Sequence, residues 1–491
     1  MSGVTIDIGK TPKNGLKTEN DSNNYHYEDD STRERVNVTL VEKLSGTPGY
    51  ITLTYTPHNS ETKITGIKES GLNKNEFNTN ITDSKIVTVY YWSLDNTFSN
   101  PLLVQFGEGG SSVYYYITGN GNTWKTESGI SGSTLKDKLD KQNCKRNKAH
   151  TVDISKKNDT SRDIKYNCPG CGSKPITVNK YGTDYATTDY SCYYHYLPSG
   201  SGYISGLQDK VTEQTGIKFT DTISIVYVYH YPSGSDGIPL LIYLLGSRWF
   251  ERASIDSNNW TEVKKDKPGS IDEKGKILKL LRAKLLTVTI DLGQTNADNG
   301  VSGTYSDLPG GGEGKQIEVG RKDLGDGFVS FVHSVKGKTD FVAGDVKHNN
   351  DTLQGINKSF ILQSVTAYYE GGFKLDNLLM VRLEKKNGQD KYVYYSREDG
   401  GSRWIPLYDQ TGKIDGSSLT TKLYQSKNDL TKLYGIKSKL EVKREGSYQY
   451  TVGVSAGIIA GIIIGIICAV ASIAFVVWWK KRFIAKLIIN L

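Results

Sequence analysis

Short apolar stretches separated by polar turns run through most of this chain. They are rich in Val, Ile, Tyr and Thr, and Gly, Pro, Asn or Ser bounds them on either side. This pattern is typical of strands in antiparallel sheets, where β-branched and aromatic side chains pack on a pleated surface. The clearest predicted strands are residues 50–55, 86–92, 102–106, 113–118 and 223–231.

Three further stretches have residues compatible with helices, at 134–142, 271–286 and 417–434. In the second of these, one helical stripe carries Ile277, Leu280, Leu281 and Leu285, as a helix that packs on a sheet requires. We therefore predict a mainly β fold, in which β-rich α+β modules each end in a helix or linker.

The strand pattern occurs three times. The segment VTIDIGKTPKNG, which begins at Val4, returns as VTIDLGQTNADNG at Val288, and a weaker copy, TVDISKKNDTS, begins at Thr151. Further sets of residues correspond in the same order: Asp7, Asp153 and Asp291; Tyr90, Tyr229 and Tyr368, at intervals of 139 residues; and Trp124, Trp260 and Trp404. This repetition predicts three tandem antiparallel-sheet modules, with the Trp residues in their cores and the Asp residues capping turns.

The repeats and the segments after them divide the chain into six predicted parts. These are module 1 at residues 1–146, the cysteine-containing module 2 at 147–286, module 3 at 287–440, a basic juxtamembrane stalk at 441–451, a transmembrane helix at 452–479 and a short basic tail at 480–491. A module of this length is large enough to bury a core of its own.

The apolar run at residues 452–479 carries no charge. As a helix it would reach about 42 Å at about 1.5 Å per residue, enough to cross a hydrocarbon core of about 30 Å with tilt. Trp478 and Trp479 close the run, as interfacial aromatic residues do. We predict a single membrane-spanning helix here, with the lipid bilayer as a partner.

Glycine recurs at every fourth position of this predicted helix. The four residues are Gly453, Gly457, Gly461 and Gly465. Such a face lets a second backbone approach closely, so it is a candidate surface for association into a homo-oligomer. The alternative is that glycine is simply common in membrane helices.

The charges around the predicted helix favour a cytoplasmic C-terminus, because Lys480, Lys481 and Arg482 follow it directly. Lys443 and Arg444 on the other side weaken this bias. The opening residues, MSGVTIDIGK, lack the apolar stretch of a signal peptide. Two interpretations follow. We favour a cell-surface or secretory-pathway protein whose signal precedes this sequence; the alternative is a tail-anchored protein with its modules in the cytosol.

Composition narrows the possible functions. The net charge of +8 is spread over 491 residues without a long basic run, so we expect no nucleic-acid partner. The 32 tyrosines reflect either a biased genome or a Tyr-rich binding surface. No catalytic motif is present among the histidines and carboxylates, so we predict no enzymatic activity and no cofactor.

Four cysteines lie in or beside module 2, namely Cys144, Cys168, Cys171 and Cys192. Their even number favours two disulfides in an oxidising compartment. Cys168, Cys171, Cys192 and His195 also have the spacing of a zinc site, C-x2-C followed by C-x2-H. Strand alternation argues against this set, because it places Cys192 and His195 on opposite faces. Free thiols are the third alternative.

The VTIDIG-type starts, the VTVYY and PLLV strands, the late Trp of each module and the C-terminal anchor together resemble a multigene family of Theileria equi-type piroplasm parasites. The modules are also faintly similar to FAINT-type domains. The resemblance spans nearly the whole chain and implies a surface or secreted protein that faces the host, but it implies no functional residues.

Tandem modules, one anchor, Tyr-rich strands and the resemblance together predict a non-catalytic surface antigen or adhesin-like protein. Its expected partners are a host protein or glycan. The alternative is an intracellular, tail-anchored membrane scaffold that associates through the glycine face.

Overall fold

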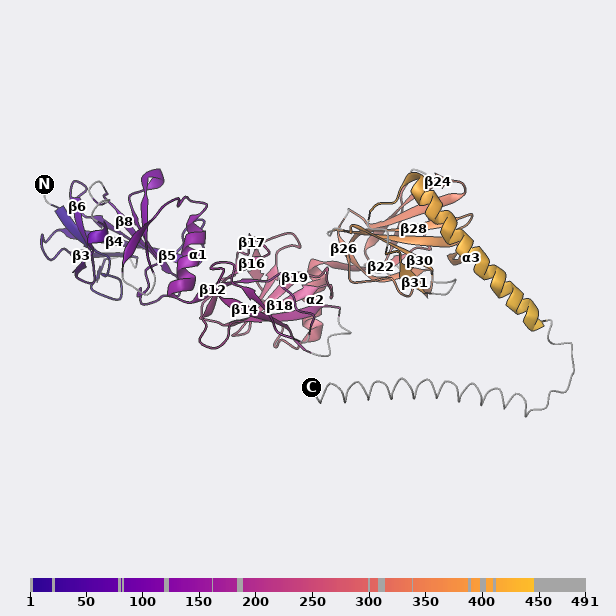
Figure 1. Cartoon of the computed structure of the whole chain (residues 1–491), viewed down its shortest axis with the longest axis horizontal. Coiled ribbons are helices and arrows are strands. Elements are labelled where there is room, and N and C mark those ends of the chain that lie inside the picture. Colours follow the sequence, from indigo (N-terminus) through magenta and orange to yellow (C-terminus); the bar gives the residue numbers. More distant parts are fainter. Residues whose placement is uncertain are drawn as a thin grey trace, which may run out of the picture.

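The computed structural model describes residues 3–445, except 20–22, 78–80, 82–83, 119–122, 161, 183–188, 299–300, 308–313, 338, 387–389, 398–402 and 409–411; side chains are described as far as residue 431. Three sheet assemblies follow one another in a line from the N-terminal end to a long helix (Figure 1). They coincide with the three repeats of the sequence, and we refer to them as modules 1, 2 and 3.

Module 1 has one large antiparallel sheet. Its strands, in sheet order, are β11 (Trp124–Glu127), β10 (Val113–Ile117), β9 (Leu103–Phe106), β8 (Val87–Trp92), β5 (Tyr50–Pro57), β4 (Arg35–Val41), β3 (Asn24–Glu28) and β2 (Lys17–Thr18). A small sheet lies beside it, formed by β1 (Gly3–Asp7), β6 (Lys63–Glu69) and β7 (Leu72–Asn73). The helix α1 (Leu135–Arg146) follows.

Module 2 repeats this strand order. Its large sheet contains β21 (Trp260–Glu262), β20 (Arg248–Arg252), β19 (Ile238–Leu244), β18 (Ile225–Tyr231), β15 (Ser191–Tyr196), β14 (Pro175–Lys180) and β13 (Ile164–Asn167). Its small sheet contains β12 (Ala149–Asp153), β16 (Tyr203–Asp209) and β17 (Thr212–Glu213). The helix α2 (Lys274–Lys284) follows.

Module 3 has the same order again, with its two sheets joined through one strand pair. The large path contains β31 (Trp404–Pro406), β30 (Tyr392–Arg397), β29 (Leu378–Lys385), β28 (Ile361–Glu370), β25 (Phe328–Val335), β24 (Gln316–Gly325) and β23 (Gly303–Ser306). The smaller set contains β22 (Leu286–Asp291), β26 (Phe341–His348) and β27 (Asp351–Thr352), and β26 also pairs with β28. The helix α3 (Gly416–Glu445) follows.

The first strand of each module runs parallel to its partner in the small sheet. Each of these three pairs has a register shift after its second or third residue pair, at Val4/Thr5, His150/Thr151 and Val288/Thr289. Because the shift occurs at corresponding residues, it is a property of the repeated backbone and not an accident of one copy.

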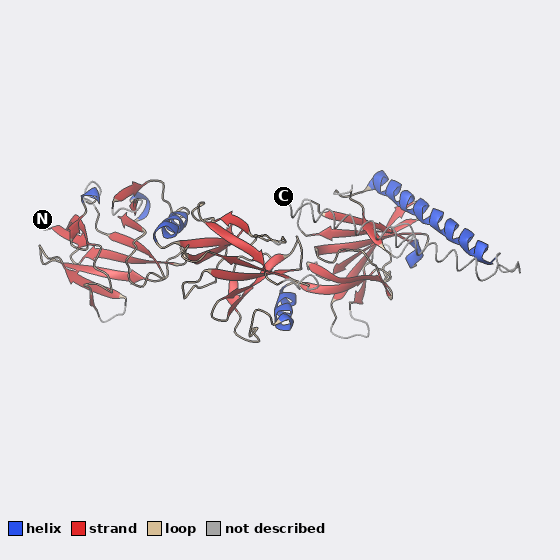
Figure 2. Ribbon diagram, turned by 60° about the horizontal axis from the view of Figure 1, so that its bottom comes forward, coloured by secondary structure: helices blue, strands red, loops and turns tan. Residues whose placement is uncertain are grey.

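Each large sheet has two buried faces. The inner face packs against the small sheet, and the buried Trp124, Trp260 and Trp404 belong to the three inner cores. The outer face is covered by the helix that ends the module (Figure 2), as with Leu281 of α2, which lies in one cluster with Tyr229 and Trp249. Tyr90, Tyr229 and Tyr368 all belong to these outer clusters. Residues that alternate along one strand therefore serve two cores.

The mainly β prediction is confirmed, and so are the five strands predicted most clearly, which correspond to β5, β8, β9, β10 and β18. Helices occur at all three predicted places. The predicted boundary at residue 286 falls at the first residue of β22, and the boundary at residue 440 falls inside α3.

The helix α3 extends through residues predicted as the start of the stalk. Residues 436–445 contain no Gly or Pro, so the segment favours a helix, and α3 is described as far as Glu445. In the described part of the chain, no helix is both long enough and apolar enough to span a membrane. The predicted span at 452–479, its glycine face and the tail lie outside the described residues.

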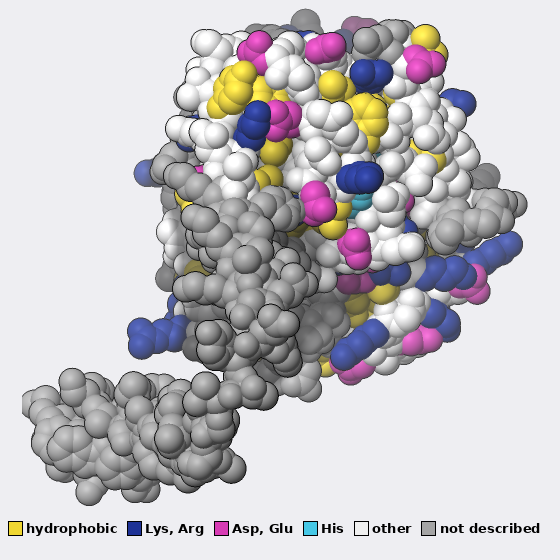
Figure 3. Space-filling model, turned by 90° about the vertical axis from the view of Figure 1, so that its right-hand side faces the viewer, with side chains coloured by type: hydrophobic (Ala, Val, Ile, Leu, Met, Phe, Trp, Pro, Cys, Tyr) yellow, Lys and Arg dark blue, Asp and Glu magenta, His cyan; other side chains and the backbone are white. Residues whose placement is uncertain are grey.

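At the end of the molecule where module 3 and α3 lie, lysine and arginine side chains are interspersed with aspartate and glutamate (Figure 3). The described part of this face therefore presents both signs of charge side by side.

Candidate functional site

The repeated aspartates cap turns. The carboxylate of Asp7 accepts N–H bonds from Gly9 and Ser70, both at 2.9 Å. The equivalent bonds run to Asp153 from Ser155 and Lys210, both at 3.0 Å, and to Asp291 from Gly293 at 3.0 Å and Asn349 at 2.7 Å. Ser70, Lys210 and Asn349 each have a positive φ. The capping interpretation is confirmed, because these carboxylates compensate backbone donors in tight turns.

A tyrosine also belongs to this repeated motif, and the sequence analysis missed it. The backbone N–H of each aspartate donates to a hydroxyl, that of Tyr27 at 2.7 Å, Tyr166 at 3.2 Å and Tyr305 at 3.0 Å. These tyrosines recur at intervals of 139 residues, the interval already seen for Tyr90, Tyr229 and Tyr368, so this spacing could have identified them.

Three cysteines and one histidine meet where module 1 ends and module 2 begins. Cys144 lies near the end of α1, His150 on β12, and Cys168 and Cys171 in the turn between β13 and β14. Their ligand atoms all lie within 4.8 Å of one another. The sulfurs of Cys144 and Cys168 are 3.6 Å apart, and Cys171 Sγ is 3.8 Å from His150 Nδ1. This set of atoms could hold a metal ion.

The turn that carries Cys168 has a close counterpart in module 1. The N–H of Thr151 donates to Cys168 Sγ at 3.3 Å, and in module 1 the N–H of Thr5 donates to Asp29 Oδ2 at 3.2 Å. Both turns close with the same backbone bond, Gly172 N to Cys168 O and Arg33 N to Asp29 O, and both donors have a positive φ. The turn therefore accepts an anionic side chain in module 1, and in module 2 a sulfur occupies that position.

The electrostatics of the cluster favour a thiolate at Cys168. The hydrogen bond from Cys144 lowers the pKa of Cys168 well below its ordinary value, and contacts with His150 and the N–H of Thr151 lower it further. The pKa of Cys144 is raised, first through the same bond to Cys168 and then by burial. The opposite shifts make Cys168 the more acidic of the two thiols.

The structure separates the alternative zinc set that the sequence spacing suggested. Cys168 and Cys171 lie together, whereas Cys192 lies in the outer cluster with Tyr229, where burial raises the pKa of its thiol. His195 is fully buried on the inner side, with Nδ1 2.9 Å from the Tyr166 hydroxyl. Alternation along β15 places the two side chains on opposite faces, as expected, and the set that meets is completed by Cys144 and His150 instead.

All four described cysteines are free thiols. Because Cys192 lies in a different cluster from the other three, the structure does not bring the four cysteines into two pairs. The sequence contained one hint of the observed set, the five residues KRNKA between Cys144 and His150. This spacing matches no familiar ligand motif, so it was not recognised.

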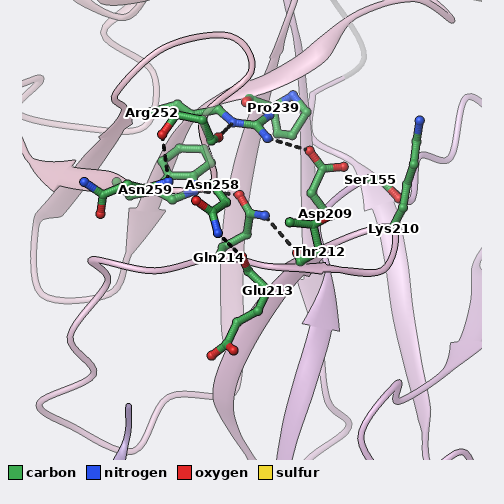
Figure 4. A network of polar contacts seen from close by, with 12 residues as sticks. Ser155, Asp209, Lys210, Thr212, Glu213, Gln214, Pro239, Arg252, Asn258 and Asn259 are labelled. Atoms are coloured by element: carbon green, nitrogen blue, oxygen red, sulfur yellow. Dashed lines mark hydrogen bonds and ion pairs between the residues drawn. The ribbon is translucent and has the colours of Figure 1, made fainter. Parts of the chain in front are cut away.

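A second polar network in module 2 serves the fold (Figure 4). The buried Arg252 bonds to Asp209 at 2.9 Å and to the carbonyl of Pro239 at 3.2 Å. Beside it, Trp260 Nε1 donates to Gln214 Oε1 at 2.9 Å. Asp209 and Gln214 belong to the small-sheet side and Arg252 and Trp260 to the large sheet, so the network ties the two sheets together.

Module 2 also carries a row of tyrosines on the outer face of its sheet. Tyr194, Tyr227 and Tyr243 are directly opposite one another on three adjacent strands, and all three are partly exposed. Tyr194 and Tyr227 lie 5.9 Å apart between ring centroids, and Tyr227 and Tyr243 lie 5.8 Å apart. The corresponding rows are Thr54, Thr88 and Gln105 in module 1, and Val332, Thr366 and Arg382 in module 3. We call Tyr194, Tyr227 and Tyr243 the tyrosine row.

Comparison of the chain with protein-family models, with curated proteins and with solved structures finds no match. The fold and the sites therefore define the class of protein only as a mainly β protein built from three copies of one module.

Proposed function

We propose that this chain is a non-catalytic, membrane-anchored display protein that binds a host protein or glycan through its second module. The tyrosine row carries the proposal. The three modules share one strand order, yet only module 2 has aromatic residues at these three positions. The fold that the three modules share therefore does not require tyrosines at these positions, which leaves binding as their proposed role.

Tyrosine suits a binding surface, because it offers a large, rigid and amphipathic contact area at a low cost in conformational entropy. Tyr181 extends the row, with its ring centroid 5.4 Å from that of Tyr227. Tyr227 and Tyr243 are partly buried and pack against the apolar cluster that contains Leu281 of α2. This packing holds their rings in place. A pre-ordered aromatic surface loses little freedom when a partner binds.

The linear arrangement of the modules supports display. Modules 1, 2 and 3 follow one another in line, and α3 extends away from module 3 at the far end of the described chain from the N-terminus (Figure 1). In this proposal the row lies on the middle module, held away from the bilayer by module 3.

The binding experiment uses the full chain in membranes and exchanges residues between modules. The variant Tyr194→Thr/Tyr227→Thr/Tyr243→Gln gives module 2 the row of module 1. We expect binding to host cells to fall at least about tenfold, because aromatic anchors at an interface each contribute about 2 kcal/mol or more.

The matched control is Thr54→Val in module 1, which introduces the residue of module 3 and leaves the tyrosine row untouched. Its binding should equal that of the wild type. If the triple variant binds as well as the wild type, the tyrosine row is not the binding surface.

Display on the cell surface is tested separately, by protease treatment of intact cells followed with an antibody against module 3. An epitope that survives until the cells are permeabilised would favour the cytosolic, tail-anchored alternative.

A further inference from the structure

The geometry points to a structural zinc site that joins module 1 to module 2, with Cys144, His150, Cys168 and Cys171 as its four ligands. This site is independent of the proposed binding function, and it differs from the set predicted from sequence spacing.

The separations match tetrahedral zinc. With Zn–S near 2.3 Å and Zn–N near 2.0 Å, ligand atoms in a tetrahedral site lie about 3.3–3.8 Å apart. The sulfurs of Cys144 and Cys168 are 3.6 Å apart, and Cys171 Sγ and His150 Nδ1 are 3.8 Å apart. The remaining pairs lie within 4.8 Å, so an ion at the centre requires ligand atoms to move together by at most about 1 Å.

The burial and hydrogen bonding of the four ligands also suit a bound metal ion. Cys144, His150 and Cys168 are buried, and Cys171 is partly buried, so a bound ion would be largely shielded from water. The N–H of Thr151 and the hydroxyl of Ser173 both point at ligand sulfurs, at 3.3 and 3.6 Å, and such donors stabilise metal-bound thiolates.

Zinc explains the whole set better than a disulfide does. A bond between Cys144 and Cys168 would need the sulfurs to close from 3.6 Å to about 2.05 Å and would leave Cys171 and His150 without a role. Three soft thiolates and one imidazole form a common zinc ligand set. The metal binds all three cysteines as thiolates, so any proton still on a sulfur is released to solvent, and no electron is transferred.

The location of the site gives it a structural task. The helix α1 packs on module 1, where Leu139 belongs to the cluster of Tyr50 and Trp92. Cys144 lies on the same helix but packs into the inner core of module 2 with Val152 and Cys168. A metal bound here holds α1 to the sheet of module 2 and so fixes how the first two modules sit against each other.

Metal analysis of the full chain tests the site. We expect the protein purified in detergent to contain about one zinc per chain, which exchange for cobalt converts to the absorption spectrum of a tetrahedral thiolate site. Cys144→Ser and Cys171→Ser should each weaken metal binding at least about tenfold. Cys192→Ser is the matched control, because Cys192 is a buried free thiol in the other cluster, and it should keep the metal.

His150→Cys guards against a variant that simply fails to fold. It replaces one ligand by another, so cobalt should remain tetrahedral while its thiolate charge-transfer absorption increases. A metal-free protein with reactive thiols, a Cys144–Cys168 disulfide in protein purified without reductant, or loss of the metal in Cys192→Ser would each overturn the proposal.

Discussion

The two junctions between modules share one kind of ion pair but differ in the groups that they bury. Each has a lysine that bonds carboxylates on both sides. At the first junction Lys136 lies 2.8 Å from Asp140 of its own helix and 3.2 Å from Glu213 of module 2. At the second, Lys386 lies 2.6 Å from Asp256 of module 2 and 2.7 Å from Asp340 of its own module.

The groups buried at the two junctions differ in kind. At the second, Val342 and Ile361 of module 3 belong to the same apolar cluster as Leu281 of α2, so a single hydrophobic core continues across the boundary. At the first, Ala149 of β12 joins the apolar cluster of Leu139, and the Cys/His cluster lies beside it in the contact between α1 and β12. Apolar burial therefore crosses both junctions, and only the first adds groups that a metal ion could bind.

The largest expected effect is at the apolar junction. Ile361→Ala removes a buried side chain, which costs about 2–5 kcal/mol and speeds local opening at least about thirtyfold. Hydrogen exchange of peptides from α2 and β26 measures this. Ile164→Ala, which changes the same residue type at an exposed site of module 2, should leave exchange unchanged. An Ile361→Ala variant with wild-type exchange would show that the cluster does not hold the junction.

The next effect is at the first junction and depends on the zinc site. Removing zinc that is present at a hundredfold excess over its dissociation constant costs about 2.7 kcal/mol. A strong chelator should therefore speed exchange in α1 and in the turn at Cys168 by about a hundredfold, while α2 exchanges as before. Equal acceleration at both junctions would contradict the comparison, since it would mean that the metal acts on the whole molecule.

The smallest expected effect comes from the bridging lysines that both junctions contain. Lys136→Met and Lys386→Met should each cost about 1 kcal/mol or less, and salt should reduce both losses, because partly exposed ion pairs are weak and screened. Burial opposes the charge on each lysine, but the paired carboxylates raise the pKa of both above the ordinary value.

A lysine whose pKa is raised by folding stabilises the protein fully below its ordinary pKa and loses that contribution as the pH rises through the raised value. The difference in urea midpoint between wild type and each variant should therefore be constant near neutral pH and shrink in strong alkali. A difference that grows with pH would show that the carboxylates do not control these lysines.

Much of the fold could be predicted, because it depends on local pattern and on repetition. Strands such as β8 have alternating or continuous apolar residues between turn residues, and Tyr90, Tyr229 and Tyr368 keep one interval in all copies. The end of α3 was misjudged, because stalk residues rich in Lys and Glu are equally good helix formers.

The Cys/His cluster could not be predicted from spacing, because it depends on how modules pack. Cys144 belongs to the helix of one module, and only its contact with the core of the next brings it to Cys168. What the sequence did determine was a negative result: strand alternation separates Cys192 from His195, and the structure agrees.

Asp29 and Cys168 occupy the same turn in two copies of one module, and each accepts the same N–H. The backbone N–H at this turn thus stabilises a negatively charged acceptor, whether a carboxylate or a thiolate supplies it. A duplicated module could exchange carboxylate for thiolate there by changing single residues, while its neighbours kept the original version. Duplication would then provide both the scaffold for a new ligand site and an unaltered copy of the original beside it.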